Sequence, residues 1–197
     1  EDTEVFRQRY FSSFESQAFG GNKKDYYQKV TTIEGVGGCK VYRAVNAEGV
    51  ETGANVLVVI TNAEHGVANS TLVSKIQELI DPLQNQAGDG LAPIGHICRV
   101  RAAEGVVINI NTNIVYDTGF SFQALQSHIT KAVDEYLHQL NLTWDKNDSL
   151  VVRISNIESR ILAIDGVKDI SDTKLNGVAS NVILDKNAIA VRGKING

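Results

Sequence analysis

The sequence has no long hydrophobic run: in 197 residues, the longest purely apolar stretch is Val56–Ile60. A transmembrane helix needs about 20 consecutive apolar residues, so the sequence predicts no membrane span. It also has no cluster of positive charge, because its Lys and Arg residues are scattered and the net charge is −4. Proteins that bind a phosphate backbone present a basic patch. We therefore expect neither a membrane nor a nucleic acid among the partners.

Cysteine is scarce as well, and only Cys39 and Cys98 are present. The two could form one disulfide bond, but both lie in strand-like patterns, which favours small buried thiols. The chain starts at Glu1 and has no charged and then apolar leader. We expect that an amino-terminal region normally precedes Glu1.

The composition is that of an ordinary globular protein, with 43% hydrophobic and 21% charged residues. A chain of this length accommodates two domains of about 100 residues, each with its own small core. The change of pattern at Ala103–Gly105 places the boundary there. We predict a first domain over residues 1–104 and a second over residues 105–197.

The most informative stretch is Val151–Gly177. Four isoleucines at helical spacing form one apolar stripe, Gly166 takes the left-handed conformation that ends the helix, and Val167 begins a strand. A similar pattern occurs 131 residues earlier. We interpret the two as related helix-to-strand units, with coincidence as the alternative. The equivalent positions are Tyr26, Val30, Ile33, Glu34, Gly35 and Val36 in the first unit and Ile157, Ile161, Ile164, Asp165, Gly166 and Val167 in the second.

In the first half, periodicity predicts helices over residues 2–18, 24–33 and 70–81 and strands over 39–45, 55–61 and 97–102. Strand 39–45 alternates Cys39 and Val41 with Lys40 and Tyr42, as a half-buried strand does. Strand 55–61 is almost continuously apolar, which is typical of a central strand covered on both faces. A polar turn is expected at 46–53 and a loop at 84–95.

The helix at 70–81 has the clearest signals. Asn69 or Ser70 can cap its first turn, and Pro82 ends it. Five apolar side chains are expected to point inward, namely Leu72, Val73, Ile76, Leu79 and Ile80.

In the second half, residues 106–116 alternate almost strictly, with Asn109, Asn111 and Asn113 on the face toward water. Ser121 is expected to cap a long helix that ends at Leu140. Residues 181–184 and 188–193 resemble a closing hairpin. Because strands and helices alternate without a regular strand-helix-strand order, the sequence predicts an α+β fold of two small layered subdomains with mixed or antiparallel sheets.

The glycine-rich segment Gly35–Lys40 suggests a phosphate-binding loop, since glycine amides can cradle an anion at a helix start. The pattern does not fit. A dinucleotide fingerprint needs glycine where Lys40 stands, the other phosphate loop needs Gly-Lys followed by Ser or Thr, and a strand follows here instead of a helix. A tight turn explains the glycines better.

The four histidines do not form a metal-binding motif. His128 and His138 are ten residues apart on one helix, so they lie about 15 Å apart on different faces. His96 and Cys98 share a strand face, but a zinc site needs three or four ligands. No nucleophile elbow is present, and carboxylates such as Asp165 and Asp169 fit a solvated turn. We predict no catalytic, cofactor-binding or metal-binding residues.

Several segments in order resemble one family, the baseplate J-like proteins of contractile phage tails and tailocins. The segments are Phe6–Tyr10, Gly20–Asn22 with Asp25–Tyr26, Ile33–Gly37 with Lys40–Val41, Leu91–Gly95, Ile154–Asp172, Leu175–Gly177 and Ile189–Gly193. Each is unspecific alone, and the order and spacing over nearly the whole chain carry the resemblance. It covers the central and carboxy-terminal parts of such proteins.

The resemblance implies a structural, non-enzymatic component of a baseplate wedge. Its partners would be other wedge and hub proteins and copies of itself in a ring, and its location would be the virion tail baseplate, assembled in the bacterial cytoplasm. No cofactor is implied, and the isolated chain could be monomeric. The alternative is an α+β enzyme or small-molecule-binding module that uses the Gly35–Lys40 turn with His96 and Cys98. The Asn109–Asn113 face and the Gln84–Gly90 loop are candidate interfaces.

Overall fold

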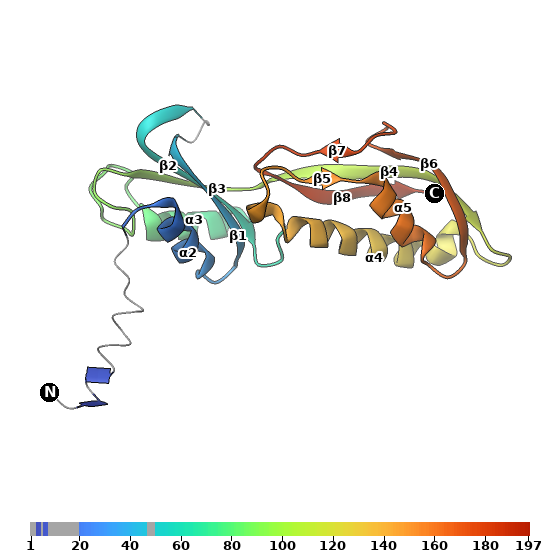
Figure 1. Ribbon diagram of the computed structural model, residues 1–197, viewed down its shortest axis with the longest axis horizontal. Coiled ribbons are helices and arrows are strands. Elements are labelled where there is room, and N and C mark those ends of the chain that lie inside the picture. Colours follow the sequence, from blue (N-terminus) through green and yellow to red (C-terminus); the bar gives the residue numbers. More distant parts are fainter. Residues whose placement is uncertain (1–2, 5, 8–19, 47–49) are drawn as a thin grey trace.

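The protein forms two consecutive α+β units along an elongated molecule (Figure 1). The structure is a computed structural model, and it describes residues 3–4, 6–7, 20–46 and 50–197. The helix expected at residues 2–18 lies almost entirely outside these ranges. The predicted α+β class is confirmed, since helices pack on two mixed sheets.

The first unit contains a three-stranded sheet with the order β1-β2-β3. Strands β1 and β2 are antiparallel, and β2 and β3 are parallel. Its elements are α2 (Lys23–Thr31), β1 (Val36–Val45), β2 (Glu51–Asn62), α3 (Ser70–Ile80) and β3 (Ile97–Ala102).

The second unit contains a sheet with the order β6-β4-β8, in which β4 runs antiparallel to β6 and parallel to β8. Helices α4 and α5 contact this sheet, and β5 and β7 form a separate two-stranded sheet. Its elements are β4 (Glu104–Tyr116), α4 (Phe122–Asn141), a short 3-10 helix η1 (Trp144–Lys146), β5 (Val151–Val152), α5 (Ile154–Leu162), β6 (Val167–Leu175), β7 (Val182–Ile183) and β8 (Ala188–Asn196).

The ends of the helices follow the capping signals in the sequence. Asn69 caps α3 by accepting a hydrogen bond from the Leu72 N–H at 2.8 Å, and Ser121 caps α4 in the same way. Asn22 caps α2. These side chains satisfy amide groups that the first helical turn leaves unpaired.

The two helix-to-strand units have the same turn. Gly35 and Gly166 have φ angles of +97° and +94°, and the residue after each donates to a carbonyl three positions earlier. The strands that follow, β1 and β6, are both edge strands antiparallel to a central strand, whose other neighbour is parallel. The similarity between the units therefore extends from sequence to sheet arrangement.

Strand β2 is covered on both faces, as its apolar run predicts. Val56, Val58 and Ile60 belong to the core beneath α2 and α3. Leu57 and Val59 point the other way and join the core of the second unit. The second unit therefore covers the face of the first sheet that points away from α2 and α3.

This cover corrects the expectation of a half-buried β1. Lys40 is only 8% exposed, because the second unit lies over its face of the sheet.

The polar turn expected at residues 46–53 is shorter than expected, since β2 already begins at Glu51; residues 47–49 lie outside the described part of the chain.

Two further expectations were wrong. Leu79 is 45% exposed, because α3 turns Gln77 toward β3 and leaves Leu79 at the side of the helix. Residues 181–184 and 188–193 do not form a hairpin: β7 pairs with β5, while β8 runs parallel to β4. A turn at Asp185–Ala188 does exist, but it leads from one sheet to another.

Candidate functional site

The two parts of the sequence-based alternative site do not meet. Lys40 pairs with Val59, and Cys98 pairs with Val56, on opposite sides of β2. Three residues along a strand and two strand spacings separate them by about 14 Å. Cys98 faces the helix-covered core, whereas the Lys40 side chain reaches the second unit. The Gly35–Lys40 segment, His96 and Cys98 therefore form no common site.

The individual residues have ordinary structural surroundings. Cys39 and Cys98 are free and buried, as predicted, and burial raises the pKa of Cys98 to about 12. The Nδ1 atom of His96 lies 3.0 Å from the hydroxyl oxygen of Tyr26. The thiols of Cys39 and Cys98 stay protonated at neutral pH, so neither is an activated nucleophile.

The Gly35–Lys40 segment is a turn followed by a strand. Gly37 and Gly38 already belong to β1 and pack against Thr61 and Asn62 of β2. Both glycines belong to a strand, and no helix begins there whose first turn could bind an anion.

The histidines of α4 separate as expected. His138 meets His65 of the first unit, edge to face, with ring centroids 6.4 Å apart. Within residues 3–4, 6–7, 20–46 and 50–197, no group of three or more His, Cys, Asp or Glu side chains could hold a metal ion. In the same ranges, none of the helices is long and apolar enough to cross a bilayer.

The polar contacts that matter most lie at the junction between the units, where Lys40 is central. Its Nζ donates to the carbonyl oxygens of Asn147 at 2.7 Å, Asp148 at 3.3 Å and Lys186 at 2.5 Å. It also lies 4.8 Å from the ring centroid of Trp144. One side chain of β1 thus binds two separate loops of the second unit.

The electrostatics of Lys40 follow from this position. Burial lowers its pKa, because removal from water disfavours the charged form. Asp148 and Asp145 act in the opposite direction. In the sequence, Lys40 ends a glycine-rich segment and lies in a predicted strand, and nothing local indicates its distant carbonyl partners.

Two tyrosines cross the same junction. The Tyr27 hydroxyl donates to Asp145 at 2.8 Å, and the Tyr42 hydroxyl donates to Asn187 at 2.6 Å. The Lys186 ammonium lies 5.0 Å from the ring centroid of Tyr42. A cleft of about 370 Å³ remains between these contacts and opens to solvent.

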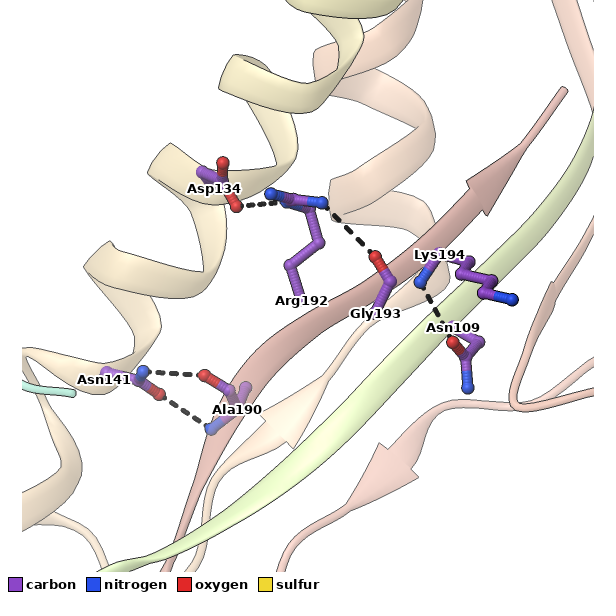
Figure 2. A network of polar contacts seen from close by, with 7 residues as sticks. All are labelled: Asn109, Asp134, Asn141, Ala190, Arg192, Gly193 and Lys194. Atoms are coloured by element: carbon purple, nitrogen blue, oxygen red, sulfur yellow. Dashed lines mark hydrogen bonds and ion pairs between the residues drawn. The ribbon is translucent and has the colours of Figure 1, made fainter. Parts of the chain in front are cut away.

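Side-chain amides close the sheet edges in both units. Gln77 of α3 accepts from the Val100 N–H and donates to the Cys98 carbonyl, both on β3. Asn141 of α4 makes the equivalent pair with the N–H and carbonyl of Ala190 on β8 (Figure 2). Each amide imitates the pairing of a neighbouring strand, so these edge positions are satisfied within the chain.

Figure 2 also shows how the rest of β8 is held. Arg192 forms an ion pair with Asp134 of α4 at 2.6 Å, and the Lys194 N–H donates to the Asn109 side chain at 3.0 Å. Asn109, Asn111 and Asn113 are all exposed, as expected, although Asn109 is already engaged within the chain by this bond. The polar side chains described above connect the two units and satisfy the edge strands. Among the residues described, no acid, base and nucleophile converge.

Two family models match the chain in succession. The baseplate J-like central domain matches residues 18–102, and the baseplate J-like protein C-terminal domain matches residues 108–197. Together they leave out only the first 17 residues and the five around the change from β3 to β4.

Individual relatives agree with this. Two come from Bacillus subtilis strain 168: the uncharacterized protein YqbT, 31% identical over 196 residues, and the phage-like element PBSX protein XkdT, 28% identical over 195 residues. The matches cover 100% and 99% of this chain, which spans 53% of each relative's length.

The fold also resembles a chain in the cryo-EM structure of the anti-feeding prophage (AFP) baseplate. The TM-score is 0.53 at 7% sequence identity, over 98% of this chain and 42% of that one. At this identity the likeness concerns the fold alone. On the strength of the two successive family models, the chain belongs to the baseplate J-like family.

Proposed function

We propose that the chain is a structural component of the baseplate wedge of a contractile phage, prophage or tailocin tail, and that it acts through protein–protein assembly. The observation that carries this proposal is the succession of two baseplate J-like models over nearly all of the chain. The relative named for the phage-like element PBSX and the fold shared with an AFP baseplate chain support the same role.

The internal structure fits this role. Lys40, Tyr27 and Tyr42 join the two units, and Gln77 and Asn141 close the edges of two sheets. A part of a large assembly needs defined surfaces held in a fixed arrangement, because repeated subunits meet through the same patches. The role is non-enzymatic in our proposal.

The partners we propose are other wedge and hub proteins and further copies of the chain in a ring. The location is the tail baseplate, after assembly in the bacterial cytoplasm. We further propose that residues 1–104 and 105–197 are two domains, which agrees with the different cores of the two units.

Deletion of the gene in the producing strain tests this function. Negative-stain electron microscopy should show particles without a baseplate or with an incomplete one, and expression of the protein in trans should restore it. Normal baseplates in the deletion strain would refute the proposal.

A further inference from the structure

The cleft at the junction is surrounded by ammonium groups that the protein itself does not neutralise. Lys23 at the start of α2, Lys146 in η1 and Lys186 before β8 line it, and all three side chains are exposed. No ion pair forms at any of the three within the described part of the chain. This is a local excess of positive charge on a chain whose net charge is −4.

The carboxylates of the cleft do not cancel this excess. Asp145 accepts the hydrogen bond of Tyr27, and Asp148 is the only other carboxylate in the lining. The fourth lysine of the lining, Lys40, is already bound by three carbonyl oxygens. Three exposed cations thus face two anions, beside the ring of Tyr42.

We propose that the cleft binds an acidic, extended polypeptide segment of a neighbouring protein. The charge of the rim fits carboxylate side chains, and the tyrosines Tyr27 and Tyr42 offer contact area between the charges. Pockets for ligands occur preferentially between domains. Because Lys23 belongs to the first unit and Lys146 and Lys186 to the second, the bound segment bridges both units and holds their arrangement.

This inference rests on the proposed function only in taking the neighbour to be another baseplate protein; the binding itself is a property of the isolated chain. The probe is a fluorescently labelled hexaglutamate peptide, titrated with the purified chain by anisotropy at low salt. Lys23→Glu and Lys146→Glu should each weaken binding by roughly five- to tenfold, since each removes an attraction and adds a repulsion at an exposed site.

Lys168→Glu is the matched control, because it makes the same change of net charge at an exposed position on β6. The neighbouring Val167 pairs with Tyr116, at the end of β4 far from the junction. The control should leave the affinity within about twofold of the wild type. Circular dichroism of all three variants verifies that they are folded.

Three results would overturn the inference. One is a Lys168→Glu variant that loses as much affinity as the cleft variants, which would indicate a general charge effect. Another is a hexalysine peptide that binds as tightly as hexaglutamate. The third is complete displacement of the peptide by inorganic phosphate when phosphate and peptide supply the same concentration of negative charges. That result would indicate a site for small anions. None of these results bears on the microscopy of deletion particles, so the two proposals fail separately.

Discussion

At the residue scale, Lys40 shows how one buried charge joins two units. Its ammonium group is satisfied by three carbonyl oxygens and an indole ring, and all four groups belong to the second unit. A buried charge is tolerated only when such partners compensate for the lost water. Removal of the charge leaves these carbonyls without their shared donor.

Lys40→Met keeps an unbranched apolar side chain that is one atom shorter, and removes the charge and its hydrogen bonds. We expect a loss of about 1–3 kcal/mol in the free energy of unfolding, because three carbonyl groups lose their donor. Water from the open cleft can reach some of these carbonyl groups, which limits the loss. Urea denaturation measures it. Lys168→Met, an exposed change of the same chemistry, should cost less than about 0.5 kcal/mol. Equal effects of the two substitutions would contradict the central role of Lys40.

Tyr27 offers a test through pH. Its hydrogen bond to Asp145 is the main cause that raises its pKa from an ordinary 10.0 to about 12. A raised pKa means that the folded state favours the protonated phenol. The stabilisation is therefore complete below about pH 10 and disappears as the pH rises toward 12.

Tyr27→Phe removes this bond and should cost about 0.5–1.5 kcal/mol at pH 7. Because only the wild type loses the bond on deprotonation, the difference between the two proteins should shrink between pH 10 and 12. Urea denaturation at several pH values measures the difference. A gap that stays constant up to pH 12 would show that the difference between the two proteins does not come from the hydrogen bond between Tyr27 and Asp145.

At the scale of elements, the sequence predicts local features better than pairings. Caps at Asn69 and Ser121 and the turn at Gly166 are signalled by neighbouring residues, and the structure has all three. The partner of β8 depends on contacts far away in the chain, so the expected hairpin was wrong. Gln77 and Asn141 look like ordinary polar helix residues in the sequence, because their role depends on which strand lies beside them.

Asn141→Ala tests the closed edge of β8. The substitution leaves the N–H and carbonyl of Ala190 without partners at a site where Asn141 is 6% and Ala190 3% exposed. We expect a loss of about 2–4 kcal/mol in the free energy of unfolding, from two unsatisfied buried groups. Asn156→Ala, at an exposed position on α5, is the control. If both variants unfold at the same urea concentration, water replaces the amide and the edge needs no side chain.

Gly166→Ala tests the turn between α5 and β6. The left-handed φ of +94° strains any residue with a Cβ, and the added Cβ would lie 2.5 Å from the Phe120 ring. Strain and crowding together should cost about 2–4 kcal/mol. Gly177→Ala has a φ of +84° and nothing within 4 Å, so it should show the strain alone, about 1–2 kcal/mol. If Gly177→Ala lowers the unfolding temperature as much as Gly166→Ala or more, crowding against Phe120 does not contribute to the loss.

At the scale of the whole molecule, the two units share more than a chain connection. Leu57 and Val59 of β2 lie in the core of the second unit, and a single residue, Ala103, separates β3 from β4. The sequence predicts the boundary near this point, but not that β2 contributes one face to each core. Its continuous apolar run is the only local signal, and it is equally consistent with helices on both faces.

Because the cores meet at β2, we expect the chain to unfold in one cooperative transition although it consists of two units. Trp144, the only tryptophan, is buried at the junction and reports on it by fluorescence, whereas far-UV circular dichroism reports on all helices and strands. The two signals should coincide in urea. Leu57→Ala should then shift both by the same amount, with a loss of about 2–5 kcal/mol. A fluorescence transition that precedes the dichroism, or a Leu57→Ala variant that moves only one signal, would mean that the units unfold separately and that the junction is a hinge.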